Sequence, residues 1–170
     1  MFPLSSEAYA QHRYWMQQAL AIARTAAALG EVPIGAIAID GAGEKIAAAA
    51  NRKERDRDPT AHAELLVLRA ASRQLGSWHL GDCTLYVTLE PCPMCASAIV
   101  HARLGLLVYG ADDPKTGAIQ TAANFPASPL ANHRPAIVAG ICGAECRQQL
   151  RDWFARQRQG RNRRISGKFD

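Results

Sequence analysis

The 170-residue sequence lacks a long apolar run, an apolar export segment near its N-terminus, internal repeats and low-complexity tracts. A membrane-spanning helix needs about 18 or more consecutive apolar residues, and no run in this chain approaches that length. Nothing in the sequence therefore suggests export, membrane anchoring or a repeat array. We therefore expect a cytoplasmic protein with no membrane partner.

Cysteine is scarce as well, with five residues in the whole chain. An odd number of cysteines, two of them separated by only two residues, does not indicate a disulfide framework. The hydrophobic fraction of 48% is ample for one core at this length. We predict that residues 1–170 form a single domain, with a basic C-terminal helix or tail at about 147–170.

Two short motifs carry a candidate metal site: Thr60-Ala61-His62-Ala63-Glu64 and Glu90-Pro91-Cys92-Pro93-Met94-Cys95. Cys92 and Cys95 lie one helical turn apart at a helix start opened by Pro93, where the helix dipole favours thiolates. His62 offers a nitrogen ligand. A structural zinc site is normally closed by four protein ligands, whereas one His and two Cys leave the fourth position for water.

Glu64 is the candidate proton carrier of this site. It follows His62 by two residues at a helix start, so its carboxylate can approach a bound water without binding the metal. Taken alone, Cys92-x-x-Cys95 is also typical of a thioredoxin-like redox pair, and the triplet around His62 arises by chance. Together, about thirty residues apart, the two motifs form the signature of zinc nucleobase deaminases.

The order of predicted elements indicates the fold class. Periodicity and turn residues predict helices at about 6–29, 59–75, 92–102 and 146–159, strands at 34–40, 45–50, 84–89, 106–109 and 136–139, a solvated loop at 52–58, and a long loop at 111–135 with one short helix near 117–123. The strand-helix-strand unit at 84–109 should be parallel and right-handed. We predict a three-layer α/β/α fold around a five-stranded mixed, largely parallel sheet.

Several further segments, in order from Trp15 to Phe154, carry a resemblance to a known family: Glu31-Val32-Pro33-Ile34-Gly35-Ala36, Asp58-Pro59-Thr60 before His62, Thr84-Leu85-Tyr86-Val87-Thr88-Leu89 before Glu90, Asp113-Pro114-Lys115-Thr116-Gly117-Ala118, and Asn132-His133-Arg134. With both metal motifs, the chain resembles the bacterial tRNA-specific adenosine deaminases of the zinc-dependent cytidine/deoxycytidylate deaminase superfamily. The resemblance implies a cytidine-deaminase-like fold, one zinc ion per subunit and a homodimer.

The resemblance also implies a reaction, namely the hydrolytic deamination of adenosine to inosine at the wobble position of a tRNA anticodon loop. Zinc-activated water would be the nucleophile, Glu64 the proton shuttle, and His62, Cys92 and Cys95 the zinc ligands. It further implies substrate roles for five residues: Asn51 on the target nucleoside, Val32 and Leu89 as apolar walls of the base site, Asp113 near a flanking ribose, and Asn132 on the RNA-binding surface. The chain departs from the family where Pro114 and Ile119-Gln120-Thr121 replace smaller residues.

The net positive charge of the chain lies at its C-terminal end. Residues 147–170 carry a net charge of +6, whereas residues 1–146 carry −1. A solvated helix end with a solubility tail is one interpretation. The other is an RNA-binding surface, because aromatic side chains among cations stack on single-stranded bases, and Phe154 and Arg158 are its candidate residues.

Two alternative functions remain open at the level of the sequence. The Pro-Cys-Pro-Met-Cys motif also suits a deaminase of free bases, such as a guanine deaminase. A module without enzymatic activity could instead close a four-thiolate structural zinc site with Cys92, Cys95, Cys142 and Cys146 and bind nucleic acid. That second alternative leaves the motif containing His62 and Glu64 unexplained.

Overall fold

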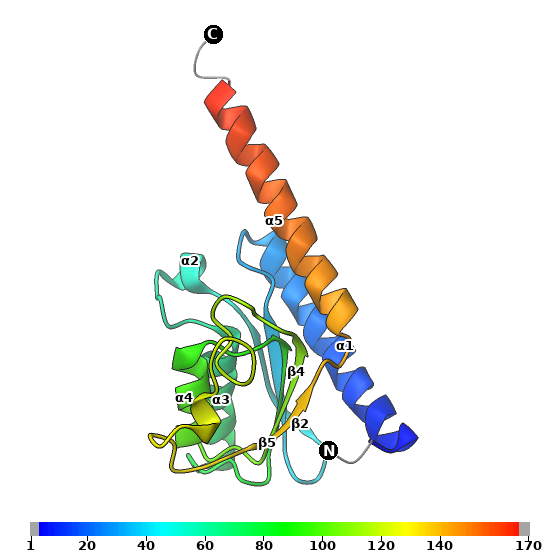
Figure 1. Ribbon diagram of the computed structural model, residues 1–170, viewed down its shortest axis with the longest axis vertical. Coiled ribbons are helices and arrows are strands. Elements are labelled where there is room, and N and C mark those ends of the chain that lie inside the picture. Colours follow the sequence, from blue (N-terminus) through cyan, green and yellow to red (C-terminus); the bar gives the residue numbers. More distant parts are fainter. Residues whose placement is uncertain (1–3, 167–170) are drawn as a thin grey trace.

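The computed structural model describes residues 4–166, with the side chains of residues 4–159, and places five strands in one sheet with helices on both faces (Figure 1). The elements are α1 (Ser6–Ala28), β1 (Gly35–Ile39), β2 (Lys45–Ala50), α2 (Lys53–Asp56), α3 (Ala63–Leu75), β3 (Thr84–Leu89), α4 (Pro93–His101), β4 (Leu106–Ala111), a 3₁₀ turn (Phe125–Ala127), β5 (Ala136–Ala139) and α5 (Gly143–Ser166). The predicted α/β/α fold is therefore confirmed.

The sheet has the strand order β2-β1-β3-β4-β5. The pairs β3–β4 and β4–β5 are parallel, as predicted for the strand-helix-strand unit. Strand β1, however, pairs antiparallel with both β2 and β3. The sheet is thus mixed as expected, but only half of its strand pairs are parallel, because the N-terminal hairpin joins β3 through its first strand.

Two apolar layers fill the space on either side of the sheet. Alternate residues of a strand face opposite sides, so Ile37 of β1 packs with Met16 of α1 in one layer, whereas Ala38 packs with Val67 of α3 in the other. Figure 1 shows α1 and α5 together along one face of the sheet and α3 and α4 on the opposite face. This arrangement leaves the N-terminal ends of α3 and α4 free to form a site.

Several predicted boundaries shift by a few residues. The loop at 52–58 contains the short exposed helix α2, α3 begins at Ala63 and not at 59–60, and α5 begins at Gly143 and not at 146. The short helix expected near 117–123 is wrong, and a 3₁₀ turn lies at Phe125–Ala127 instead. The physical reason is that the backbone N–H groups of residues 119–121 donate to the Glu90 carboxylate and not to carbonyls of their own segment.

Helix α5 extends well past the sheet and projects away from the other elements (Figure 1). The described part of the chain contains no helix with the length and apolar character required to cross a bilayer. Residues 167–170, which belong to the predicted basic tail, lie outside the described residues.

Candidate active site

His62, Cys92 and Cys95 converge where α3 and α4 begin. The His62 Nδ1 atom lies 3.6 Å from the Cys95 Sγ and 3.8 Å from the Cys92 Sγ. One ligand atom from each residue lies within 4.8 Å of the others, and among the described residues no other cluster of three such side chains occurs. One nitrogen and two sulfurs form a donor set that suits zinc.

Local structure explains why the two cysteines face the same way. Cys92 is the N-cap residue of α4, and Pro93 occupies the first helical position, where its missing N–H costs no hydrogen bond. Cys95 lies in the first turn and is fully buried. Helix α4 begins just after the C-terminal end of strand β3, and there both sulfurs face His62.

His62 is itself the N-cap residue of α3, but its side chain makes no capping hydrogen bond. The cap comes from Asn51, at the end of β2, whose Oδ1 accepts a hydrogen bond of 2.9 Å from the backbone N–H of Ala63. The Ala63 N–H is one of the first N–H groups of a helix, which have no acceptor within the helix and need one from outside it. Because Asn51 supplies the acceptor, the His62 ring remains available to face the thiols.

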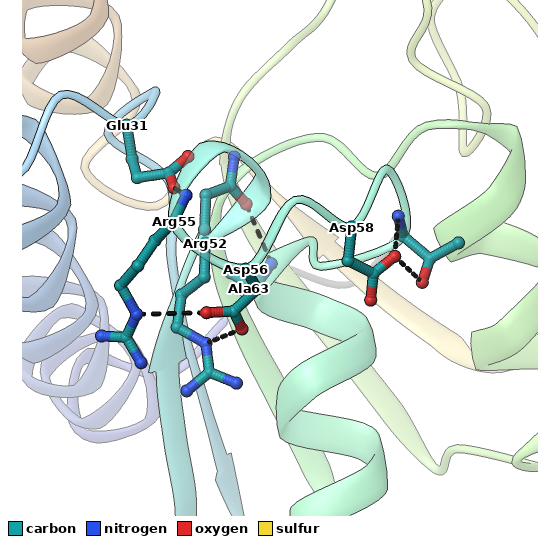
Figure 2. A network of polar contacts seen from close by, with 8 residues as sticks. Glu31, Arg52, Arg55, Asp56, Asp58 and Ala63 are labelled. Carbon is teal, nitrogen blue, oxygen red and sulfur yellow. Dashed lines mark hydrogen bonds and ion pairs between the residues drawn. The ribbon is translucent and has the colours of Figure 1, made fainter.

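Further polar contacts fix the segment that leads to His62 (Figure 2). The buried Glu31 accepts a hydrogen bond of 2.9 Å from the backbone N–H of Arg55, and Asp58 accepts one of 2.7 Å from that of Thr60. Asp56 pairs with the side chains of Arg52 and Arg55 at 3.0 and 3.1 Å. Glu31 therefore ties α2 to the chain that follows α1, the ion pairs of Asp56 lie within the α2 region itself, and Asp58 shapes the turn just before His62.

Glu64 lies in the first turn of α3 and is 4% exposed. Its Oε2 atom is buried and has no hydrogen-bond partner within the described residues. Burial raises the pKa of this carboxyl above its ordinary value. A buried carboxylate oxygen without a protein partner is costly, and its position beside the ligand cluster fits a group that exchanges protons with a bound molecule.

The thiols influence one another strongly. The Cys95 thiol, and after it the His62 ring, lower the pKa of Cys92 to about 4 against the opposing effect of burial. The pKa of Cys95 is raised, first by its hydrogen bond with Cys92 and then by burial. These opposite shifts favour the thiolate form at Cys92 and the thiol form at Cys95, and a divalent metal held by both sulfurs would favour two thiolates.

A cavity of about 520 Å³ lies between the end of β3 and helix α5. Four residues that the sequence marks for substrate contacts line it together: Val32, Leu89, Asp113 and Phe154. Phe154 is 44% exposed, so it lines the cavity while a large part of it faces solvent. The structure thus joins three distant segments and α5 into one lining.

The remaining predicted substrate residues do not line this cavity. Asn51 caps α3, Asn132 is exposed on the 128–135 segment, and Arg158 is exposed on α5 one turn beyond Phe154. Sequence analysis did not single out Arg147 and Arg151, which also line the cavity from α5. Arg147 precedes Arg151 by four residues, and Arg151 precedes Phe154 by three. This spacing places all three on one face of a helix and was the signal in the sequence that could have identified the two arginines.

The comparisons with known proteins agree with this arrangement. The sequence profile of the MafB19-like deaminases matches residues 10–141. The chain is 43% identical over 144 residues to the tRNA-specific adenosine deaminase of Haemophilus influenzae, a match that spans 85% of this chain and 83% of that protein. This chain belongs to the tRNA-specific adenosine deaminase family.

Two solved structures place the family's fold on this chain. A structure from studies of A-to-I editing by tRNA:A34 deaminases at the wobble position has a TM-score of 0.78 and 43% identity, and the match covers 80% of this chain and 98% of that one. A guanine deaminase from Bacillus subtilis has a TM-score of 0.56 and 38% identity, over 59% of this chain and 64% of its own. The tRNA:A34 deaminase structure therefore matches this chain at higher identity and with a higher TM-score than the Bacillus subtilis guanine deaminase does.

The positions of the other cysteines decide whether a four-thiolate site can form. Cys142 and Cys146 are buried among Met16 and Leu20, in the apolar layer between the sheet and helices α1 and α5. Cys83 and the region of α4 belong to the opposite layer. The four-thiolate site that the sequence left open is wrong, because the sheet separates its two halves.

Proposed function

We propose that this protein converts adenosine to inosine by hydrolytic deamination at the wobble position of a tRNA anticodon. The observation that carries the proposal is the buried, unpaired Oε2 of Glu64 beside the cluster of one His and two Cys. Family membership supplies the substrate class, since the matched relative is a tRNA-specific adenosine deaminase. The reaction consumes one water and releases ammonia.

One zinc ion per chain would be held by His62, Cys92 and Cys95. Zinc bound there would lower the pKa of a coordinated water from about 15.7 to about 7. Glu64 would accept a proton from water and pass it to N1 of adenine. The same carboxylate would then carry a second proton to the amine that leaves from C6.

The cavity beside α5 would receive the part of the anticodon loop around the target base. Val32 and Leu89 would flank apolar base surface, and Phe154 would stack on a neighbouring base. Anticodon-loop bases are already single-stranded, so moving one into a site costs less than extrusion from a duplex. The amide nitrogen of Asn51, whose oxygen is committed to Ala63, is the group left for the target nucleoside.

Arg147, Arg151, Phe154 and Arg158 would form one basic stripe for the RNA backbone. Their spacing of four, three and four residues puts them on the same face of α5. At 1.5 Å per residue the stripe spans about 16 Å, from the cavity to the part of the helix that projects beyond the sheet. Residues 160–170, which continue the basic sequence, lie outside the described side chains.

Sequencing of total tRNA after incubation with the protein would test the proposed function. Inosine pairs as guanosine, so the proposal requires new A-to-G readings at the wobble position and none in tRNA treated with the Glu64→Gln variant. An unchanged tRNA pool would contradict the proposal.

A guanine deaminase is the second candidate, favoured by the 38% identity to the Bacillus subtilis enzyme. A free base needs no phosphate contacts, however, and the arginines around the cavity would then have no partner. Assays with free guanine and with tRNA, run in parallel, separate the two functions. Release of ammonia from guanine alone would favour the second.

Phe154→Ala is expected to raise KM for tRNA by about 5- to 150-fold, because loss of one base–aromatic stack costs about 1–3 kcal/mol. The value of kcat at saturating tRNA should stay within about threefold of wild type, since the side chain lies on α5 and not among the ligands. Steady-state kinetics on an anticodon stem-loop measure both. Tyr9→Ala is the matched control, because Tyr9 is similarly exposed (46%) but lies on α1.

The proposed enzyme would act in the cytoplasm, and it would form the homodimer that the resemblance implies. Light scattering in solution would test the assembly, with a dimer expected at twice the 18.4 kDa of one chain. A monomer with full activity on tRNA would contradict this part of the proposal.

A further inference from the structure

Glu90 has an unusual environment for a carboxylate. Its side chain is 2% exposed, and it accepts hydrogen bonds from four backbone N–H groups. Oε1 accepts from Ile119, Gln120 and Thr121 at 3.1, 2.7 and 3.0 Å, and Oε2 accepts from Asp113 at 3.1 Å. The same buried carboxylate thus binds both ends of the 113–121 segment.

Neighbouring contacts reinforce this attachment. The Ala118 N–H donates to the Pro91 carbonyl at 2.9 Å, and the Glu90 N–H donates to the Ala111 carbonyl at 2.8 Å. The Tyr109 hydroxyl donates to the Gln120 side chain at 3.1 Å. The 113–121 segment is therefore fixed to the two residues that directly precede the ligand Cys92.

The anchored segment forms one wall of the cavity beside α5, through Asp113, Lys115 and Thr116. The Asp113 carboxylate accepts hydrogen bonds from Lys115 and Thr116 and so shapes the turn that presents them. Leu89, on the chain just before Glu90, lines the same cavity. In the sequence, Glu90 therefore lies between Leu89, which lines the cavity, and the candidate ligand Cys92. In space, it lies beneath the turn formed by residues 113–116.

We propose that Glu90 is a positioning residue that holds the RNA-binding wall formed by residues 113–116 in a fixed place relative to the ligand cluster. The inference rests on the proposed function for the identity of the substrate. A carboxylate is required because both of its oxygens accept, whereas the amide of glutamine has one acceptor oxygen and must turn its NH2 donor either toward the Asp113 N–H or toward the N–H groups of Ile119, Gln120 and Thr121. Neither oxygen of Glu90 is available to the substrate, so its role is indirect.

This role also accounts for the departure of the chain from its family at Ile119-Gln120-Thr121. Glu90 binds the backbone N–H groups of these residues, which are the same for any side chain other than proline. Ile119 is fully buried, and Gln120 pairs with Tyr109. Two of the three substituted side chains, Ile119 and Gln120, make contacts within the protein, and the anchoring bonds come from the backbone, so the wall can keep its place although the sequence has changed.

The variant Glu90→Gln tests the proposal. Backbone amide exchange should become about 10- to 100-fold faster at Asp113, or at Ile119, Gln120 and Thr121 if the amide takes the opposite orientation, because hydrogen bonds to a charged acceptor are lost. KM for an anticodon stem-loop should rise at least about tenfold, while kcat stays within about threefold and zinc content stays at the wild-type value. A purely structural role would not divide the effect between KM and kcat in this way.

Two further variants make the test decisive. Gly117→Ala would place its Cβ against the Glu90 carboxylate and 2.6 Å from the Asp113 carbonyl, so it should displace the anchor and reproduce the KM effect with Glu90 intact. Glu44→Gln removes the same charge from an exposed site and should change nothing. The proposal is overturned if KM is unchanged in Glu90→Gln, or, should that variant not fold, in Gly117→Ala.

The experiment separates this inference from the proposed function. A wild-type protein that does not deaminate tRNA would contradict the function, whatever the variants do. Wild-type deamination with an unaltered KM in the variants would contradict only the role of Glu90.

Discussion

Replacement of Glu64 by glutamine is expected to reduce kcat by about 10⁴-fold or more. General acid–base catalysis usually contributes about 10²- to 10⁴-fold, and the loss should reach the top of this range because the same carboxylate would move two protons. Glutamine keeps the size of the side chain, and His62, Cys92 and Cys95 stay in place. Single-turnover rates on an anticodon stem-loop measure the loss, and elemental analysis should still find one zinc per chain.

The matched control for this variant is Glu54→Gln, which removes the charge of an exposed carboxylate on α2. It should retain the wild-type rate. A Glu64→Gln rate within tenfold of wild type would remove Glu64 from the proton-transfer role, whereas loss of zinc in that variant would mean that Glu64 helps to hold the metal.

Removal of one ligand has the second large expected effect. His62→Ala and Cys92→Ser should each lower zinc below one equivalent per chain and abolish deamination, because a three-ligand site that loses one donor binds metal far more weakly. Zinc content is measured on protein purified without added metal, and the release of zinc to a colorimetric chelator gives the change in affinity.

Cys142→Ser and Cys146→Ser are the controls for the ligand variants. Both residues are buried on the other side of the sheet, and Cys146 packs closely against Gly110. Their zinc content should equal that of the wild type, although burial of a serine hydroxyl without a partner can lower stability by about 1–3 kcal/mol. Loss of zinc in these variants, with retention in His62→Ala, would contradict the assignment of the ligands.

Much of the fold could be predicted because its elements are encoded locally. Ser5 caps α1 by accepting from the Ala8 N–H, and the periodic residues Met16, Leu20 and Ala23 are buried as expected. Pro93 marks the start of α4, and Gly76, with a φ of +63°, ends α3. The parallel pairing of β3 with β4 followed from the helix between them.

The candidate ligand cluster could also be predicted, because each half of it is a short motif with fixed local geometry. Cys92 and Cys95 share one helical turn, and their pairing with His62 required only that two helix starts meet. Other roles depended on partners remote in sequence. The resemblance gave Asn51 a role on the target nucleoside only, and nothing in its neighbours indicated that it would cap a helix that begins twelve residues later.

The sequence by itself therefore determined the helices, the strands and the residues able to bind a metal, since backbone propensity, capping and motif spacing act over a few residues. Only the tertiary structure decided that β1 lies between β2 and β3, that Glu64 is buried with an unpaired oxygen, and that Glu90 anchors the 113–121 segment. It also brought Arg147 and Arg151 to the cavity. These features arise when burial removes water from polar groups, which must then find partners across long stretches of chain.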